Sequence, residues 1–316
     1  MRAFLPLLAA ASLCAQVQLS AQLVSAHDDQ PLFKAGTNVV RVDVQVEDSG
    51  HLLNTLNKDD ILIFDENTQQ RVTYFAHDVE PLSLLLLLDV SGSMSKSIDA
   101  VSRASRQAMS NLKQGDKVAV MLFARGQKVT QEFTGDFEEV SRQISSAVGD
   151  KSLGSGTLIN HAVVAASEYL QANITSGRRA ILVITDNLGL NYQLNDEQVL
   201  RKLHSANAVM SAIVTGRAKR PEVESKARYT NPDFTPSNVF ALADETGGEA
   251  FRPDKVDTAL APIFERIRNR YALEYSAPAN GKPGAYHKIR VTLSPLAERK
   301  FPKAQLRARS GYYAAE

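Results

Sequence analysis

The chain has 316 residues and a formal net charge of +1, with 36 basic against 35 acidic side chains. This length allows one large domain or about two average ones. The balanced charge argues against a nucleic-acid-binding or membrane-surface protein, because those partners select a basic excess.

The first 21 residues are predicted to be a secretory signal peptide. Arg2 supplies a positive start, and Ala3 to Cys14 is an uncharged apolar run too short to span a bilayer. Small residues follow, so cleavage after Ala15 and cleavage after Ala21 fit equally well. The prediction is an exported protein, periplasmic or secreted.

The single cysteine of the chain, Cys14, lies inside this segment. Lipoprotein processing at Cys14 is a weaker alternative, because the preceding Leu13 is bulky where that processing prefers a small residue. An exported mature chain without cysteine forms no disulfides, so its core alone must stabilise the fold.

Segment 22–80 is predicted to be β-rich. Val39 to Val46 alternates valines with polar residues, as in a half-buried strand. Ile61 to Phe64 and Arg71 to Phe75 have the composition of two further short strands. Because a three-stranded unit is only marginally stable, this segment needs a partner.

Segment 81–271 is predicted to be an α/β domain, because apolar strands alternate with amphipathic helices. The apolar strand Ala180–Thr185 suits burial on both faces. The expected fold class is a doubly wound, mostly parallel, Rossmann-like sheet, with Val129–Phe133 as an antiparallel edge and Arg217–Ser237 as a surface loop. The other expected elements are the strands Leu84–Leu88, Val118–Phe123 and Ala208–Val214, and the helices Ile98–Leu112, Phe137–Val148, Leu158–Leu170, Asp196–Ser205, Val239–Glu245 and Val256–Arg270.

Segment 272–316 returns to strand patterning, which begins with the alternating run Tyr271–Tyr275. His287–Leu293 and Leu306–Tyr313 are expected to be strands as well. We expect this segment and segment 22–80 to meet as one small sandwich beside the α/β domain.

Asp89, Ser91 and Ser93 are the first candidate functional residues. They follow the apolar run Leu84–Leu88, so they lie where a buried strand emerges. One carboxylate and two hydroxyls at alternate positions suit a hard divalent cation, which prefers oxygen ligands. Gly92 between the serines is expected to permit a tight turn.

Two further polar clusters belong to the same domain. Gly154–Thr157 places a hydroxyl just before a helix, and Thr185–Asn187 follows the strand that ends at Ile184. In an open α/β sheet, ligands bind outside the carboxyl ends of the strands. The three clusters are therefore expected to meet at one edge.

In this pattern the chain resembles von Willebrand factor type A (VWA) domains, whose metal-ion-dependent adhesion site combines D-x-S-x-S with a distant Thr and a distant Asp. The matching residues are Asp89, Ser91, Ser93, Thr157 and Asp186. The resemblance implies Mg²⁺, or else Mn²⁺ or Ca²⁺, with the three hydroxyls as direct ligands and the two carboxylates binding directly or through water. It also implies a partner protein that donates an Asp or Glu carboxylate to the metal.

Two positions depart from the family pattern. Asn187 stands where Gly often follows the Asp, and Asn160 stands where an acidic residue often follows the Thr loop. Because of these two differences, the family pattern does not specify which residues surround the direct ligands of the metal. In the structural alternative, Asp89 and Asp186 merely cap helices, because Asp is a good N-cap residue.

The resemblance extends beyond this domain. The endings Tyr271–Tyr275 (Y-x-L-x-Y) and Arg307–Tyr313 (R-x-R-x-G-Y-Y) resemble those of the exported VWFA-related family known from Acidobacteria. This wider resemblance implies architecture and export more than function.

Enzymatic motifs are missing from the sequence. Position 91 is Ser where phosphotransferases with an Asp nucleophile need a second carboxylate, and G-x-S-x-G, H-E-x-x-H, G-x-G-x-x-G and G-K-[ST] do not occur. His161 and His204 fall within expected helices, outside any triad arrangement. The basic run Arg217–Arg220 is interpreted as a solvated loop and not as a nucleic-acid site.

The resulting prediction is an exported, non-enzymatic binding or adhesion protein with no transmembrane segment after signal removal. A structural platform in an envelope assembly with a vestigial metal site is the main alternative, and a metal-dependent hydrolase is the lesser one.

Overall fold

A computed structural model describes residues 39–216, 234–278 and 282–315. The predicted signal peptide, its Cys14 and positions 217–233 of the predicted surface loop lie outside these residues. Thr37–Glu316 forms one compact unit. In the described ranges, the helices are too short or too polar to cross a membrane.

The described residues contain a central six-stranded sheet with the order β13-β11-β9-β6-β7-β8. Neighbouring strands run parallel except at the β7–β8 edge, which is antiparallel. This arrangement confirms the predicted fold class. The strands are β6 (Leu82–Asp89), β7 (Lys117–Phe123), β8 (Gln127–Thr134), β9 (Arg178–Thr185), β11 (Ala208–Val214) and β13 (Ala250–Phe251).

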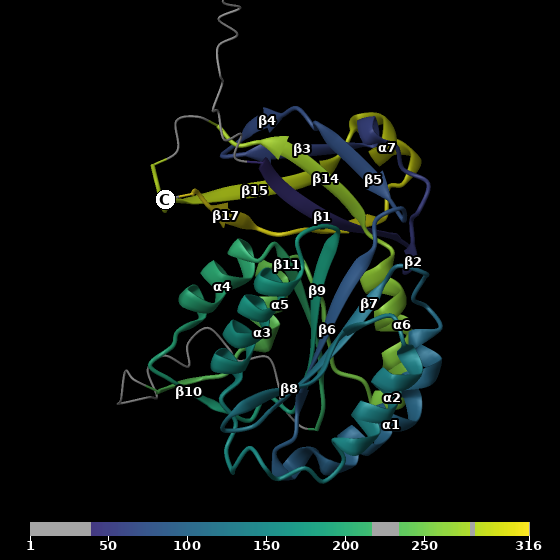
Figure 1. The fold of residues 1–316 in the computed structure, drawn as a ribbon. Coiled ribbons are helices and arrows are strands. Elements are labelled where there is room, and N and C mark those ends of the chain that lie inside the picture. The colour runs from purple at the N-terminus through teal and green to yellow at the C-terminus, as the bar shows by residue number, and fades with distance from the viewer. Residues whose placement is uncertain (1–38, 217–233, 279–281, 316) are drawn as a thin grey trace, which may run out of the picture. The chain divides into compact units, whose positions relative to one another are not determined.

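Helices cover both faces of this sheet, α1, α2 and α6 on one and α3, α4 and α5 on the other (Figure 1). Successive side chains of a strand point to opposite faces, so Leu84, Leu86 and Leu88 enter one core while Leu85 and Leu87 enter the other. Burial on both faces explains the unbroken leucine run. The helices are α1 (Ser95–Met109), α2 (Phe137–Ser146), α3 (Ile159–Asn173), α4 (Asp196–Ser205), α5 (Val239–Glu245) and α6 (Val256–Arg268).

The two ends of the chain build a second β structure together. One sheet has the order β16-β1-β14-β5 with β2 on β1, and the other has the order β17-β15-β3-β4. Both sheets share one core, so the expected β-rich unit is present. We call the following elements the β unit: β1 (Val39–Asp48), β2 (His51–Leu52), β3 (Ile61–Asp65), β4 (Thr68–Gln70), β5 (Tyr74–His77), β14 (Tyr271–Ser276), β15 (Tyr286–Leu293), α7 (Pro295–Lys300), β16 (Ala304–Arg307) and β17 (Gly311–Tyr313).

A buried carboxylate ties four strands of the β unit together. Asp65 ends β3 and accepts hydrogen bonds at 2.9 Å from the hydroxyls of both Tyr275 and Tyr312. His287 Nδ1 lies 3.1 Å from its other oxygen. Burial, reinforced by Asp65, raises the pKa of both tyrosines, so they remain neutral donors. The tyrosine-rich endings of the sequence therefore serve the core of this unit.

The short elements differ most from the sequence predictions. The expected strand Arg71–Phe75 begins only at Tyr74, because a hairpin formed by β3 and β4 comes first. Glu66 and Asn67 make its turn with φ of 46° and 74°. The expected strand Leu306–Tyr313 is split into β16 and β17, and between them the buried Arg309 donates to the carbonyl of Gly311.

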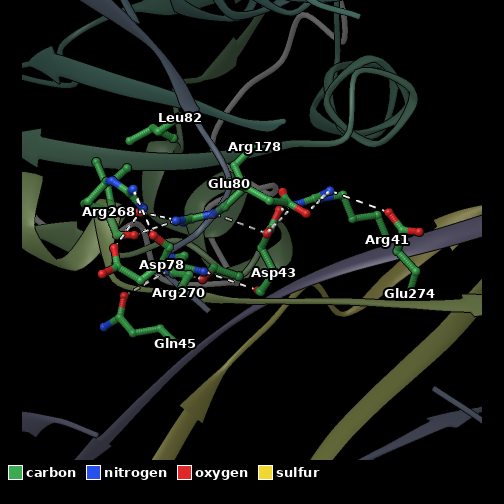
Figure 2. Close-up of polar contacts among 12 residues, drawn as sticks. Arg41, Asp43, Gln45, Asp78, Glu80, Leu82, Arg178, Arg268, Arg270 and Glu274 are labelled. Atoms are coloured by element: carbon green, nitrogen blue, oxygen red, sulfur yellow. Dashed lines mark hydrogen bonds and ion pairs between the residues drawn. The ribbon is translucent and has the colours of Figure 1, made fainter. Parts of the chain in front are cut away.

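Buried charges join the β unit to the amino end of the central sheet, as Figure 2 shows. Asp43 of β1 is 5% exposed, and its carboxylate lies 3.5 Å from Arg178 Nε and 3.4 Å from Arg41 Nη2. Arg270, just before β14, donates to the side chain of Gln45 at 3.0 Å. Burial opposes ionisation of Asp43, but the neighbouring guanidinium groups hold its pKa below the ordinary value.

The same junction holds the end of helix α6. Arg178 donates to the carbonyl oxygens of Ile267, at 2.6 Å, and Arg268. These carbonyls belong to the last turn, where a helix lacks internal donors and favours positive charge. Arg268 lies 2.8 Å from the buried Asp116, which also accepts the amide of Leu82 at the start of β6. The junction thus fixes α6, β6 and β9 at one edge.

We predict that Asp43→Ala destabilises the protein by about 3–5 kcal/mol, because removing one partner leaves a buried guanidinium without its counter-charge. Urea unfolding measures the free energy. Arg103→Ala is the matched control, since Arg103 pairs with Asp99 at the surface, where a pair contributes about 0–1 kcal/mol. Equal losses in both variants would contradict the assignment.

The protein is expected to lose stability on acidification through His204. His204 of α4 is buried beside the rings of Tyr286 and Tyr313. Burial, aided by the charge of Arg309, lowers its pKa to about 3. Between roughly pH 6.5 and 3 the unfolded chain binds a proton there that the folded chain does not, so stability falls by up to about 1.4 kcal/mol per pH unit.

Replacing His204 with Phe should flatten this dependence. Urea unfolding of both proteins at several pH values between 4 and 7 gives the two slopes. Their difference isolates His204 from the carboxylates that also titrate. Slopes that coincide would show that His204 takes up its proton equally well in the folded state.

Candidate metal centre

Asp89 is the last residue of β6 and is fully buried at the carboxyl edge of the central sheet. Its two carboxylate oxygens each accept a hydrogen bond, one from the amide of Ser91 at 2.9 Å and one from the hydroxyl of Thr185 at 2.7 Å. Pairing of β6 with β9 brings these segments together. The acid is thus oriented from both sides.

Burial raises the pKa of Asp89, and the nearby Asp186 adds to the rise. The bonds from Thr185 and Ser91 act in the opposite direction. Among the described residues, no Lys, Arg or His forms an ion pair with Asp89 or Asp186. Two neighbouring carboxylates without a basic partner favour a cation between them.

Ser91 and Ser93 lie on the turn that follows β6. Ser91 is 8% exposed and precedes a short 3-10 turn, Gly92–Met94. Its hydroxyl oxygen lies 3.3 Å from that of Ser93, which is exposed. The turn at Gly92 is present as expected, but a Cβ there would meet no atom within 4 Å, so the turn does not itself require glycine.

Thr157 is positioned by its backbone. The next amide, of Leu158, donates to the carbonyl of Ala124 at 2.9 Å, just past β7. On the other side, a Cβ at Gly189 would lie only 2.6 Å from the Thr157 carbonyl oxygen. The Thr157 loop is therefore clamped between the exit of β7 and the loop after β9. No hydrogen bond among the described residues joins its side chain to the other four candidates.

Asp186 follows β9 directly and is 5% exposed. One of its oxygens accepts the amide of Leu188 at 3.1 Å. The structure thus brings Asp89, Ser91, Ser93 and Asp186 to the ends of two adjacent strands, with the Thr157 loop packed against the second. All five candidates supply oxygen, the donor type that Mg²⁺ prefers.

Thr185 belongs to one of the polar clusters expected at this edge, but it was not among the five predicted ligands. Besides donating to Asp89, its hydroxyl accepts the amide of Asn187 at 3.1 Å. It therefore connects the acid of β6 to the loop after β9. The available signal was a hydroxyl residue that closes an otherwise apolar strand directly before an aspartate.

The two asparagines that depart from the family pattern have structural roles. Asn187 has a φ of 55°, a left-handed conformation that Gly and Asn tolerate best. Its side chain donates to the carbonyl of Ser237 at 3.0 Å. Asn160 is fully buried, and its amide group donates to the carbonyl of Leu194 and to a carboxylate oxygen of Asp196. At each of the two positions, the asparagine side chain stabilises the local backbone through hydrogen bonds in place of the residue that is usual in the family.

The candidate centre differs from a conventional metal site built from several His, Cys, Asp or Glu side chains. In the described ranges, no group of three or more His, Cys, Asp or Glu side chains is placed to hold a metal ion. The candidate centre contains only two carboxylates and relies on hydroxyls for the remainder. Such a donor set fits Mg²⁺, which keeps several waters, better than it fits zinc, which favours nitrogen and sulfur.

Residues 84–189 match the family model described as the von Willebrand factor type A domain. The chain therefore contains a VWA domain, and the matched range includes all five candidate ligands. The search of curated proteins found no match. Membership of the VWFA-related family from Acidobacteria and the exact domain boundaries stay predictions.

Three of the solved structures to which the chain is similar are the following. An aerotolerance-related membrane protein from Bacteroides fragilis is 19% identical, covering 59% of this chain and 98% of its own, with a TM-score of 0.46. A von Willebrand factor type A protein from Catenulispora acidiphila is 12% identical over 90% and 75%, with a TM-score of 0.44. The pilus adhesin SpaC from Lactobacillus rhamnosus GG is 11% identical over 85% and 49%, with a TM-score of 0.43. None of these similarities defines a partner or an activity.

We predict that Asn187→Ala is less stable than Asn187→Gly by about 1 kcal/mol. Both variants lose the side-chain bonds, but only alanine is strained at positive φ. Urea unfolding of the two variants measures the difference. If alanine proves the more stable, the left-handed conformation does not exist in solution.

Proposed function

We propose that this protein binds a partner protein through a divalent cation, Mg²⁺ first, at the carboxyl edge of the central sheet. The residues that would hold the cation are Asp89, Ser91, Ser93, Thr157 and Asp186. The observation that carries the proposal is the pair of buried, neighbouring carboxylates of Asp89 and Asp186, which no basic side chain of the described residues neutralises.

Electrostatics favours this reading over a purely structural one. Two like charges in a poorly solvated site repel each other, and burial opposes ionisation of Asp89. A helix cap would need only one acid. The two carboxylate oxygens of Asp89 instead accept hydrogen bonds from the turn after β6 and from β9. A bound cation offsets both penalties at once.

A cation held by few carboxylates keeps its attraction for a further anion. When bound, it would supply an electrophilic position for an Asp or Glu of the partner. The chain itself orients the site: Thr185 fixes the Asp89 carboxylate, and Asn187 fixes the loop that carries Asp186. The family's mode of binding thus fits the residues present.

We propose that the role is binding and not catalysis, in the envelope or outside the cell. Among the described residues, neither His161 nor His204 forms a hydrogen bond with a serine or a carboxylate of the site. The alternatives are an envelope platform whose metal site is vestigial and a metal-dependent hydrolase.

Titration of Mg²⁺ and Mn²⁺ into the purified protein by calorimetry tests the metal. One bound ion is expected, with a loss of affinity of at least tenfold in Asp89→Ala. Asp59→Ala, at an exposed acid between β2 and β3, is the control and should bind like the wild type. Absence of binding, or equal binding by Asp89→Ala, would overturn the proposed metal centre.

The partner itself is sought by a pull-down from envelope extract with and without EDTA. We expect a protein that is captured only when the metal is present and that Asp89→Ala does not capture. Hydrolysis of a test ester that Ser91→Ala abolishes would instead favour the hydrolase.

A further inference from the structure

Two exposed side chains flank the candidate metal centre on opposite sides of the Thr157 loop. Leu188 lies on the loop after β9, and Arg125 lies on the turn after β7. Neither takes part in holding the cation, and both are presented by backbone that the structure pins in place. Their chemistry bears on what kind of partner the site accepts.

Leu188 is 69% exposed although its neighbours are buried or tightly packed. Asn187 before it is anchored to Ser237, and its oxygen accepts the amide of Val239 at 3.4 Å. Gly189 after it accepts the amide and the hydroxyl of Ser237 at 3.1 and 3.0 Å. The backbone is thus held on both sides of Leu188, whose own amide donates to Asp186, so this exposed apolar side chain is carried by an anchored loop beside Asp186.

The backbone at Arg125 is also held by its neighbours. It comes two residues after Phe123, which pairs with Asp89 across β6 and β7. The turn that carries it is closed by the 2.9 Å bond from Ala124 N to the Gly126 carbonyl. A Cβ built at Gly154 would lie 3.6 Å from the Arg125 Cβ, so the arginine borders the Gly154–Thr157 loop.

The guanidinium of Arg125 is exposed and forms no ion pair with any described residue. An unpaired cation beside a metal-binding edge adds to the attraction for an anionic partner. With a whole-chain charge of only +1, this attraction is local to the edge and is not a property of the entire surface.

We propose that the partner presents an acidic peptide segment with an aliphatic side chain next to its metal-binding carboxylate. The carboxylate binds the cation, the aliphatic side chain packs on Leu188, and a second carboxylate pairs with Arg125. This assignment rests on the proposed function, since the first contact requires the metal. The other two contacts give the site its preference among acidic segments.

Synthetic fluorescent peptides test the proposal by anisotropy with the full mature chain in Mn²⁺. The first is a Gly-Ser peptide with one central Asp, the second adds a Leu beside the Asp, and the third adds a second Asp three positions away. A fourth peptide carries both additions. The added Leu and the added Asp should each tighten binding by about tenfold, which corresponds to about 1.4 kcal/mol.

Matched variants assign each gain to its residue. Leu188→Ser should abolish the gain from the added Leu, and Arg125→Ala should abolish the gain from the added Asp. Leu296→Ser, at a leucine that is 75% exposed on α7, and Arg71→Ala, at an exposed arginine between β4 and β5, are the controls and should keep both gains.

The outcomes separate this proposal from the proposed function. Failure of calorimetric metal binding would remove the function itself. Metal binding without binding of the fourth peptide would overturn the proposed roles of Leu188 and Arg125 while leaving the metal site in place. Gains that persist in Leu188→Ser and Arg125→Ala would do the same. The metal affinity of each variant is measured alongside, so that a damaged centre is not mistaken for a lost contact.

Discussion

The pairing of Asp43 with Arg178 is the contact on which the remainder of the structure depends. Asp43 belongs to β1 near the start of the described chain, and Arg178 begins β9 in the middle of the central sheet. A buried guanidinium without a counter-charge is strongly unfavourable, so the β unit can cover this end of the sheet only because Asp43 pairs with Arg178. Arg178 also holds the last turn of α6, which leads directly into β14.

The two ends of β9 therefore have different roles in the structure. Its amino end is fixed by charge, and its carboxyl end delivers Thr185 and Asp186 to the edge where β6 delivers Asp89. Because parallel strands end at the same edge, acids that are about a hundred residues apart in sequence become neighbours. The resulting repulsion would be relieved by the cation that we propose for this site.

Much of the fold and of the candidate site was predictable, because local patterns in the sequence specify it. The leucine run of β6, the alternating valines of β1 and the polar residues after each parallel strand specify the sheet and its edge without knowledge of the partners. The bond from Thr185 to Asp89 and the gathering of Tyr275 and Tyr312 on Asp65 were not predictable, because each depends on which strands pair. The β4 hairpin and α7 escaped because they are too short to show a period.

The tyrosines that surround Asp65 have an optical consequence. The chain contains no tryptophan, so its near-ultraviolet absorption and circular dichroism arise mainly from tyrosine. Two thirds of the tyrosines belong to the β unit, at the opposite edge of the sheet from the candidate metal centre: Tyr74, Tyr271, Tyr275, Tyr286, Tyr312 and Tyr313, of nine in all. The native spectrum is thus a signature of the β unit, and its intensity reports whether the two ends of the chain have come together.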